Sequence, residues 1–265
     1  MLDPLTATSR AFDSVAGDYD GPLGNNALIQ KMRAQVMDTI ERAFPRGARL
    51  LDLGCGTGID AAYLAARGYA ITALDSSPAM VSRTKERLQR GNLAARAIHL
   101  GIHELAQLDA REYDGAYSNF GALNCVPDLR AVSSALASKL KPGGLLVASV
   151  IGRYCPWELA FYTLRGDWNR ARVRLARGMV AAPLNGQTVW TRYYSPREFY
   201  RDFSTHFQQV SVRALALFVP PPYLVHAYEG FPRAFAVLER LDRVLAYKAL
   251  FRNAGDHFLV VLTRK

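Results

Sequence analysis

The chain has 265 residues, of which 50% are apolar and 21% charged, so one large domain could bury a sizeable core. The apolar fraction excludes a disordered chain. No apolar run approaches the roughly 20 residues that a membrane-spanning helix needs, and the start of the chain resembles no secretory signal. Cys55, Cys125 and Cys155 are odd in number and widely spaced, which favours neither a disulfide framework nor a metal site. We therefore expect a soluble, cytoplasmic protein with no metal.

The formal net charge is +10, from 33 basic and 23 acidic residues. Only six of the basic residues are Lys and the remaining 27 are Arg, a bias that the base composition of a genome can produce by itself. The alternative is an anionic partner, such as a phosphorylated substrate, an acyl carrier protein, a membrane surface or nucleic acid. Charge alone does not choose among these partners.

Periodicity predicts an α/β architecture over the first 150 residues. Residues 27–44 read as a helix that ends at Pro45. Five apolar runs of strand length follow, at 48–53, 69–74, 95–100, 115–118 and 145–150, and stretches with helical spacing lie between them at 59–67, 78–90 and 129–140. Strands that alternate with helices predict a doubly wound parallel sheet covered on both faces.

The alternation stops after Val150. Residues 151–194 show no clear strand–helix unit, although they contain several aromatic residues and a cluster of Arg. A helix at 196–203, a strand at 209–217, an amphipathic helix from 232 to about 250 and a last strand at 257–263 complete the chain. We interpret residues 1–265 as a single domain, with an N-terminal segment 1–45, a core 46–150 and two mainly helical inserts, 151–194 and 219–250.

The most informative segment is the glycine-rich loop between the first strand and the helix after it. Gly54, Gly56 and Gly58 occupy this loop, where a ligand could approach the backbone without meeting a Cβ atom. Asp75 ends the next strand, at the position where an acidic side chain accepts hydrogen bonds from the two hydroxyls of a ribose. The pattern therefore predicts a nucleoside-cofactor site at the carboxyl ends of parallel strands.

The loop differs from a dinucleotide fingerprint, which would read GxGxxG and face a pyrophosphate. It reads Leu51-Asp-Leu-Gly-Cys-Gly-Thr-Gly58, and its acid, Asp52, suits a ligand with an amino group and a sulfonium. Here the sequence resembles the class I S-adenosylmethionine-dependent methyltransferases, especially the small-molecule group that shares the LDLGCGTG loop. The resemblance is good over residues 12–150 and fainter beyond them.

The resemblance implies a Rossmann-like, seven-stranded sheet that is mostly parallel, with an antiparallel last strand between the fifth and sixth. It also implies S-adenosylmethionine as cofactor and S-adenosylhomocysteine as product. Segment 1–45 would then fold over the cofactor, while the inserts would cap the substrate. The residues that it assigns to the cofactor are Tyr19, Arg33, Asp52, Gly54, Cys55, Gly56, Thr57, Gly58, Asp75, Ser76, Met80, Ile102, His103, Asn119 and Phe120.

One departure from the family concerns adenine. Members often carry an Asp after the third strand whose carboxylate contacts the adenine amino group, whereas this chain has His99-Leu-Gly-Ile-His-Glu104. Either backbone groups and His103 satisfy the adenine edge, or adenine is held mainly by packing against Ile102.

The implied topology places the start of the last strand at the cofactor edge. His257 stands there, and it is a candidate base for a hydroxyl or amine acceptor because histidine titrates near neutral pH. Tyr19 is a second catalytic candidate, and Tyr154, Trp157 and His226 are candidate substrate contacts in the inserts. No pair of these residues has the spacing of a recognised catalytic motif.

The inserts offer two further patterns. Arg170, Arg174 and Arg177 would share one face of a helix, as a solvated surface or as a docking site for an anion. In the second insert, an apolar stripe comprising Phe235, Leu238, Leu241 and Leu245 predicts core packing, with part of it available to a hydrophobic acceptor.

We expect a methyltransferase acting on a small, apolar or anionic-tagged molecule. An RNA or protein methyltransferase is one alternative, motivated by the positive charge. Ser118-Asn119-Phe120-Gly121 follows the fourth strand where amino-directed DNA enzymes carry Asp/Asn-Pro-Pro-Tyr/Phe, which makes nucleic acid the weaker prediction. The other alternative is a cofactor-binding protein without transferase activity. Neither the acceptor atom nor the oligomeric state follows from the sequence.

Overall fold

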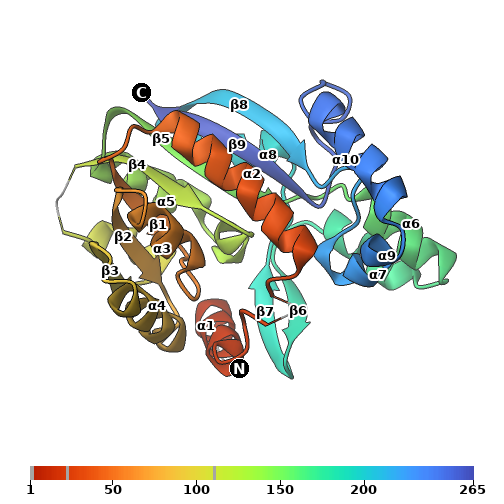
Figure 1. Ribbon diagram of the computed structural model, residues 1–265, viewed down its shortest axis with the longest axis horizontal. Coiled ribbons are helices and arrows are strands. Elements are labelled where there is room, and N and C mark those ends of the chain that lie inside the picture. The colour runs from red at the N-terminus through yellow and green to blue at the C-terminus, as the bar shows by residue number, and fades with distance from the viewer. Residues whose placement is uncertain (1–2, 22–23, 110–111) are drawn as a thin grey trace.

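A seven-stranded sheet forms the centre of the computed structural model, which describes residues 3–21, 24–109 and 112–265 (Figure 1). The strand order is β3-β2-β1-β4-β5-β9-β8, and β9 runs antiparallel to both of its neighbours. This topology confirms the predicted Rossmann-like sheet. The strands are β1 (Arg49–Leu53), β2 (Ala70–Asp75), β3 (Ala95–His99), β4 (Tyr113–Ser118), β5 (Leu140–Ile151), β8 (Phe207–Leu215) and β9 (His257–Arg264).

Helices cover both faces of the sheet, as the alternation predicts. One face packs on α2 (Ala27–Ala43), α3 (Ile59–Ala65) and α4 (Pro78–Arg90), and the helix α2 crosses that face diagonally in Figure 1. The other face packs on the 3-10 helix η1 (Ile102–Gln107), α5 (Leu129–Lys139) and α8 (Pro196–Phe203). Their buried side chains form two apolar layers, which is why the central strands read as almost continuous apolar runs.

The carboxyl ends of the parallel strands meet at one edge of the sheet. There β1 runs into the glycine loop, β2 ends at Asp75, and β5 ends at Ile151. Because β9 is antiparallel, it begins at this same edge, with His257 paired to Ile151. The predicted location of His257 in the fold is therefore confirmed.

The two inserts form most of one end of the molecule (Figure 1). The first begins with α6 (Pro156–Leu164), α7 (Trp168–Arg172) and the 3-10 helix η3 (Val173–Leu175). The second contains the 3-10 helix η4 (Pro222–Leu224), α9 (Val225–Gly230) and α10 (Pro232–Leu245), so the predicted long helix ends earlier than residue 250. Phe235 of α10 lies 6.4 Å from Trp157 of α6, measured between ring centroids, which joins the two inserts.

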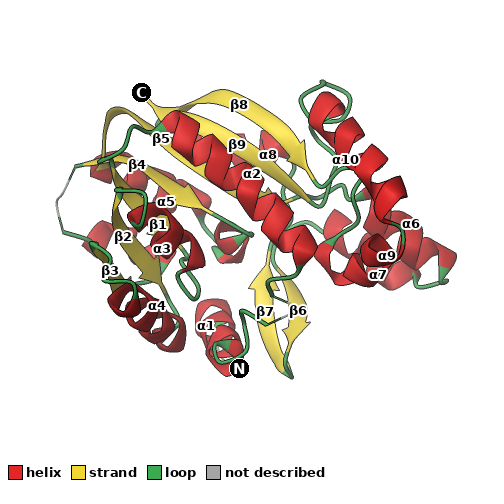
Figure 2. Ribbon diagram, in the orientation of Figure 1, coloured by secondary structure: helices red, strands yellow, loops and turns green. Residues whose placement is uncertain are grey.

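The first insert also contains a β-hairpin that the periodicity did not predict. It consists of β6 (Val180–Leu184) and β7 (Gln187–Thr191), which stand apart from the main sheet (Figure 2). Asn185 and Gly186 form its two-residue turn with φ values of 47° and 72°, the left-handed conformation that an Asn-Gly turn requires. The Asn-Gly pair was thus the signal for this hairpin in the sequence.

Segment 1–45 contributes a second helix besides α2. This helix, α1 (Pro4–Val15), packs against the hairpin and against α4 (Figure 1). Asp3 caps its first turn by accepting hydrogen bonds from the backbone N–H groups of Leu5 and Thr6. No helix within the described residues is long and apolar enough to span a bilayer.

Candidate functional site

A cavity of about 360 Å³ opens at the carboxyl edge of the sheet. Its walls come from the glycine loop, from the ends of β2 and β4, from α1 and from the β6–β7 hairpin. The residues that line it are Leu5, Thr8, Phe12, Tyr19, Asp20, Arg33, Gly54, Cys55, Gly56, Thr57, Ile59, Asp60, Asp75, Ser76, Met80, Ile102, His103, Asn119, Phe120, Gly121, Ala122, Cys125, Val126, Ile151, Ala182, Pro183, Leu184, Val189, Thr191 and Tyr193.

The glycine loop forms the floor of the cavity. Gly56 adopts a φ of +54°, and a Cβ atom added there would point toward the Tyr19 ring, 4.0 Å away, with nothing nearer. Gly58 has a different role, because its Cβ would lie 2.7 Å from Cγ2 of Thr84 on α4. The middle glycine therefore leaves room for a ligand, while the last one permits close packing of α3 and α4.

Asp75 holds the loop in place at the end of β2. Its Oδ2 accepts a hydrogen bond from the Gly56 N–H at 2.8 Å, and its Oδ1 accepts one from the Ser77 N–H at 2.9 Å. Burial raises the pKa of Asp75, against the lowering effect of these two bonds. Each carboxylate oxygen has a second lone pair, so both can still accept hydrogen bonds from a ligand in the cavity.

The segment after α1 covers this loop. The Thr57 hydroxyl donates a hydrogen bond to Asp20 at 2.5 Å, and Arg87 of α4 pairs with the other oxygen of Asp20. Tyr19 faces the cavity beside them, and burial raises the pKa of its phenol to about 12. The phenol is therefore neutral near pH 7 and can donate a hydrogen bond, but it cannot serve as a base there.

A polar cluster joins α2, α3 and the loop after β4. Arg33 donates to Asp60 at 2.7 Å, and the Asn119 amide donates to the other carboxylate oxygen of Asp60 at 2.9 Å. The Arg33 guanidinium also lies 5.0 Å from the centre of the Phe120 ring, within the range of a cation–π interaction. Phe120 itself has a φ of +51°, which is uncommon for a residue with a side chain.

The far half of the cavity is apolar. Phe120, Ile151 and Val189 line it together with the inner residues of the hairpin. The thiol of Cys125 is also buried there, and burial raises its pKa to about 12. This half therefore suits an uncharged, apolar molecule better than an anion.

The structure brings together most of the residues assigned to the cofactor. Only Asp52 and Gly58 of that set do not line the cavity. Asp52 lies buried within β1, where burial and the nearby Asp60 raise the pKa of its carboxyl, and its Oδ2 has no hydrogen-bond partner among the described residues. The assignment of individual residues to the cofactor stays a prediction, because no ligand contact tests it.

The three predicted substrate contacts lie away from this cavity. Tyr154 is 49% exposed, and the His226 side chain is almost fully solvent-exposed, with Glu229 beside it. The Trp157 indole donates a hydrogen bond to the Phe218 carbonyl at 2.8 Å, so its ring packs between the inserts. Their substrate role remains a prediction that this geometry does not favour.

His257 lies behind Phe120, at an edge-to-face centroid distance of 6.1 Å, and does not line the cavity. Its Nδ1 is 2.9 Å from Oδ2 of Asp256, while its Nε2 is buried without a partner among the described residues. Burial alone would raise the pKa of Asp256, but Arg174 and His257 outweigh it and hold that pKa well below its usual range. The ionised Asp256 therefore orients the imidazole.

The predicted helical face shared by Arg170, Arg174 and Arg177, whether solvated or docking an anion, was wrong, because Arg174 is buried. The helix α7 ends at Arg172, and Arg174 is buried, with its guanidinium 2.7 Å from Asp256 and 2.5 Å from Glu158. The helical spacing was misleading because the chain turns into a 3-10 helix before the arginine.

Phe120 apart, most residues of the apolar half of the cavity were not predicted from the sequence. Leu184 and Val189 belong to the hairpin, whose Asn-Gly turn was the available signal. Tyr193 and Thr191 follow on the same strand and its exit, and Cys125 lies in the loop after β4. No local pattern marked Thr191 and Cys125, since only the tertiary fold brings them to the cavity, whereas Tyr193 is one of the aromatic residues of the first insert that suit an apolar acceptor.

The family model described as a methyltransferase domain matches residues 28–216. The chain belongs to this methyltransferase family. The match covers the cofactor-binding core and the first insert, and the sheet topology agrees with the class I fold that the glycine loop led us to expect.

Curated relatives of this methyltransferase include two proteins named ubiquinone biosynthesis O-methyltransferase. The protein from Xanthomonas axonopodis pv. citri is 32% identical over 136 residues, which is 51% of this chain and 56% of that protein. The protein from Alkalilimnicola ehrlichii is 28% identical over 164 residues, or 58% of this chain and 66% of that protein. The matched region thus spans less than two thirds of the length of these relatives.

Solved structures with the same fold cover nearly the whole chain. The 1,6-didemethyltoxoflavin-N1-methyltransferase of Burkholderia thailandensis was solved with bound 1,6-didemethyltoxoflavin and S-adenosylhomocysteine. It gives a TM-score of 0.57 at 20% identity, and the match covers 100% of this chain and 91% of that chain. The N-methyltransferase NodS of Bradyrhizobium japonicum, solved with S-adenosylhomocysteine, gives 0.60 at 14% identity, with 98% of both chains covered. At these identities the likeness concerns the fold alone.

Proposed function

We propose that the protein is an S-adenosylmethionine-dependent methyltransferase that methylates a small, mainly apolar molecule. The observation that carries the proposal is the cavity itself, which is lined by polar residues around the glycine loop and by apolar residues of the hairpin, with Phe120. Membership of the methyltransferase family supports the reaction, and the bound S-adenosylhomocysteine in the two solved structures supports the cofactor.

The residues of the polar half fit such a cofactor. Asp75 would hold the ribose hydroxyls with its free lone pairs, and the open space above Gly56 would admit the methionine portion. Ile102 and Met80 line the part of the cavity beyond Asp75 and would pack on adenine, with His103 near its polar edge. When bound, the cofactor supplies a methyl group on a sulfonium.

The protein's own task is to align the acceptor and exclude water. α1 and the hairpin close the cavity from one side, and Tyr19 offers a neutral hydroxyl that could orient the acceptor. His257 would serve as a base only if Phe120 turned aside, since that ring separates the imidazole from the cavity. We therefore propose Tyr19 as an acceptor-positioning group and leave His257 as the candidate base.

Calorimetric titration with S-adenosylmethionine, S-adenosylhomocysteine and NAD tests the cofactor. We expect micromolar binding of the first two and no binding of NAD. Gly56→Ala should abolish binding, while Gly68→Ala is the matched control, because Gly68 has a φ of +90° with open space around it and lies outside the cavity. Equal affinities in Gly56→Ala and the wild type would contradict the proposal.

A labelled methyl donor, incubated with a cell extract, separates the candidate acceptors. Label in extractable small molecules supports the proposal, whereas label in RNA or protein, or no transfer at all, would overturn it. The names of the curated relatives make ring hydroxyls of apolar molecules the first acceptors to assay. We also propose a cytoplasmic location, supported by three cysteines that are free thiols.

A further inference from the structure

The helix α10 has apolar side chains on two opposite sides. Its inner side packs on the protein, with Phe235 buried against Trp157 and Tyr228, and Ala246 buried at its end. Asp242, also on the inner side, accepts hydrogen bonds from the backbone N–H groups of Leu217 and Phe218 at 3.2 and 2.6 Å. These contacts fix which side of α10 faces solvent.

The outer side of α10 carries a second apolar row. Val237, Leu241 and Val244 follow one another at helical spacing and are 56%, 39% and 64% exposed. Leu241 was predicted to be core, together with Phe235, Leu238 and Leu245, but it points outward. Most amphipathic helices of globular proteins bury one stripe and leave charged residues outside, so this outer row is unusual.

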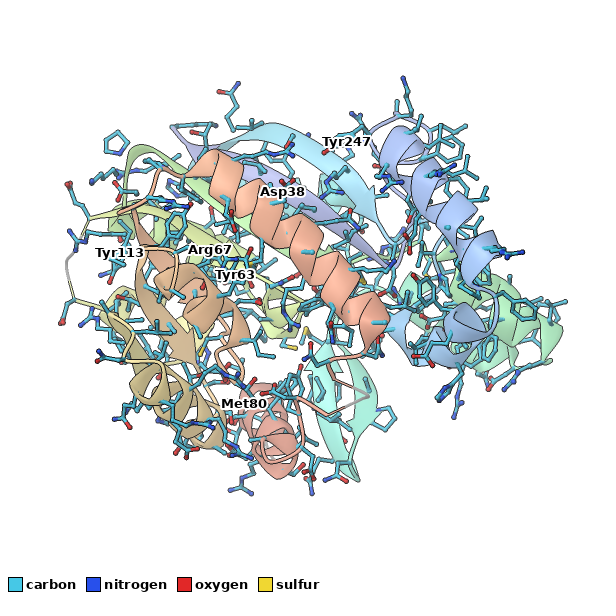
Figure 3. The ribbon with its side chains drawn as sticks, in the orientation of Figure 1. Asp38, Tyr63, Arg67, Met80, Tyr113 and Tyr247 are labelled. Carbon is cyan, nitrogen blue, oxygen red and sulfur yellow. The ribbon has the colours of Figure 1, made fainter. Side chains whose placement is uncertain are left out.

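Other exposed apolar residues occupy the same end of the molecule. Apart from Val210, every exposed large apolar side chain among the described residues lies within positions 154–175 or 223–250. We call these the apolar cap surface: Tyr154, Leu159, Leu164, Trp168, Leu175, Tyr223, Phe231, Val237, Leu241, Val244, Tyr247 and Leu250. Figure 1 shows α6, α7, α9 and α10 gathered at this end, and Figure 3 labels Tyr247 beyond the last turn of α10.

The same two inserts are strongly basic. Their exposed cations, together with Arg252 just after the second insert, are Arg165, Arg170, Arg172, Arg177, Arg233, Arg240, Arg243, Lys248 and Arg252. Glu229 is the only exposed acidic residue between positions 154 and 252. Glu158 and Asp202 are buried, Glu239 and Asp242 are engaged inside, and the half-buried Asp167 and Glu198 pair with Arg170 and Arg153. Exposed aliphatic side chains among arginines therefore characterise this surface.

We propose that the apolar cap surface docks the protein on an anionic lipid bilayer. Aliphatic and aromatic side chains would enter the interface, while the long arginine stems keep their charges at the phosphate level. A second copy of the chain is a poorer occupant, since it would bring the same cations face to face. Nucleic acid would match the charge but would leave the outer row of α10 without an apolar partner.

Co-sedimentation with lipid vesicles tests this proposal without any assay of catalysis, so its outcome is separate from that of the proposed function. We expect the wild type to sediment with vesicles of equal parts phosphatidylcholine and phosphatidylglycerol, but not with phosphatidylcholine alone. Binding should weaken as salt rises. Because each cation near such a surface is worth about fivefold in binding, Arg240→Glu/Arg243→Glu should lower the partition coefficient about thirtyfold or more.

A second variant removes apolar contact instead of charge. Val237→Ser/Val244→Ser should lower binding roughly tenfold, because two exposed valines no longer enter the interface. The matched controls are Arg46→Glu/Lys85→Glu and Val210→Ser, which make the same changes at exposed positions outside the inserts and should bind like the wild type.

Three results would overturn the proposal. The wild type could fail to bind anionic vesicles even at low salt. The control Arg46→Glu/Lys85→Glu could lose binding as much as Arg240→Glu/Arg243→Glu, which would indicate attraction by net charge alone. Sedimentation velocity could also reveal a dimer that Val237→Ser/Val244→Ser dissociates, which would assign the surface to a second copy of the chain.

Discussion

Arg174 shows how a single buried residue joins distant segments. Besides its ion pairs with Glu158 and Asp256, its guanidinium donates to the backbone carbonyls of Gly152 at 3.2 Å and Asp256 at 2.9 Å. It thereby ties the first insert to the end of β5 and the start of β9. Cys155, Glu158 and Asp256 are close enough to hold a metal ion, but the cation at this place is the arginine.

Arg174→Met should destabilise the protein by about 3–5 kcal/mol, because two buried carboxylates lose their cation. Urea unfolding measures this change. Arg170→Met is the control, since Arg170 is exposed in the same insert, and its effect should stay within about 0.5 kcal/mol. Equal midpoints for the two variants would show that the buried network contributes nothing.

The effect of Arg174→Met should also depend on pH. Folding lowers the pKa of Asp256, so its ionised carboxylate stabilises the folded protein. This contribution to the unfolding free energy is complete at pH values above the pKa of an unfolded Asp, about 3.9, and is lost as the pH falls from there toward the lower folded pKa. In Arg174→Met, the buried Asp256 carboxyl has lost its cation, so we expect its pKa to be raised. Protonation at acidic pH then removes the unpaired buried charge and restores part of the lost stability. The difference in unfolding free energy should therefore shrink between about pH 6 and pH 3, and a constant difference would contradict this account.

At the scale of elements, α1 acts as a clamp between the hairpin and the cofactor half of the cavity. The Thr8 hydroxyl accepts a hydrogen bond from the Trp190 N–H at 3.0 Å on one side, and the Ser9 hydroxyl donates to the Ser76 carbonyl at 2.8 Å on the other. Asp13 completes the second contact by accepting from the Ser77 hydroxyl and the Ala79 N–H. Met80, labelled in Figure 3, lies on α4 beside this junction.

Asp13→Ala should release α1 from α4 and lower the affinity for S-adenosylhomocysteine roughly tenfold, at a stability cost of about 1 kcal/mol. Asp128→Ala is the matched control, because Asp128 caps α5 through two backbone N–H groups and does not line the cavity. Both variants should lose similar stability in thermal unfolding. Calorimetry should detect weaker binding only in Asp13→Ala, and equal affinities would refute the clamp.

At the scale of the whole molecule, the fold buries two of the three thiols and partly covers the third. Cys55 and Cys155 are buried, while Cys125 is half-buried in the cavity. Burial raises the pKa of Cys125 and of Cys155 to about 12 and that of Cys55 well above its usual value. Since the thiolate is the reactive form, the folded protein should be inert toward thiol reagents.

Reaction with Ellman's reagent at pH 8 should be at least about a hundredfold slower in the native protein than in urea. S-adenosylhomocysteine should slow the reaction of Cys125 further, because the ligand would fill the cavity that this thiol lines. Cys155, outside the cavity, serves as the internal control. Rapid native labelling of all three residues would mean that the core opens easily.

The sheet and the glycine loop could be predicted from the amino-acid sequence alone. Continuous apolar runs such as 48–53 and 145–150 indicate strands that are buried on both faces of a sheet. A glycine-rich loop with an acidic residue at the end of the next strand indicates a local backbone geometry. Both features can therefore be predicted without knowledge of tertiary contacts. The Asn185-Gly186 pair likewise predicts a hairpin turn without any tertiary contact.

The residues that complete the cavity could not be predicted in this way, because long-range contacts bring them together. Tyr193, Thr191 and Cys125 carry no shared local pattern, and they meet because the end of the first insert folds back beside the loop after β4. Tyr154 and His226 lie away from the cavity for a related reason. The presence of a tyrosine or histidine in an insert does not indicate which way the insert turns, so the sequence could not place these side chains. The sequence predicts that Arg174 is a surface cation, whereas in the structure it is buried with Glu158 and Asp256. The sequence could not show this, because a charge is buried only where partners that are distant in sequence pair with it.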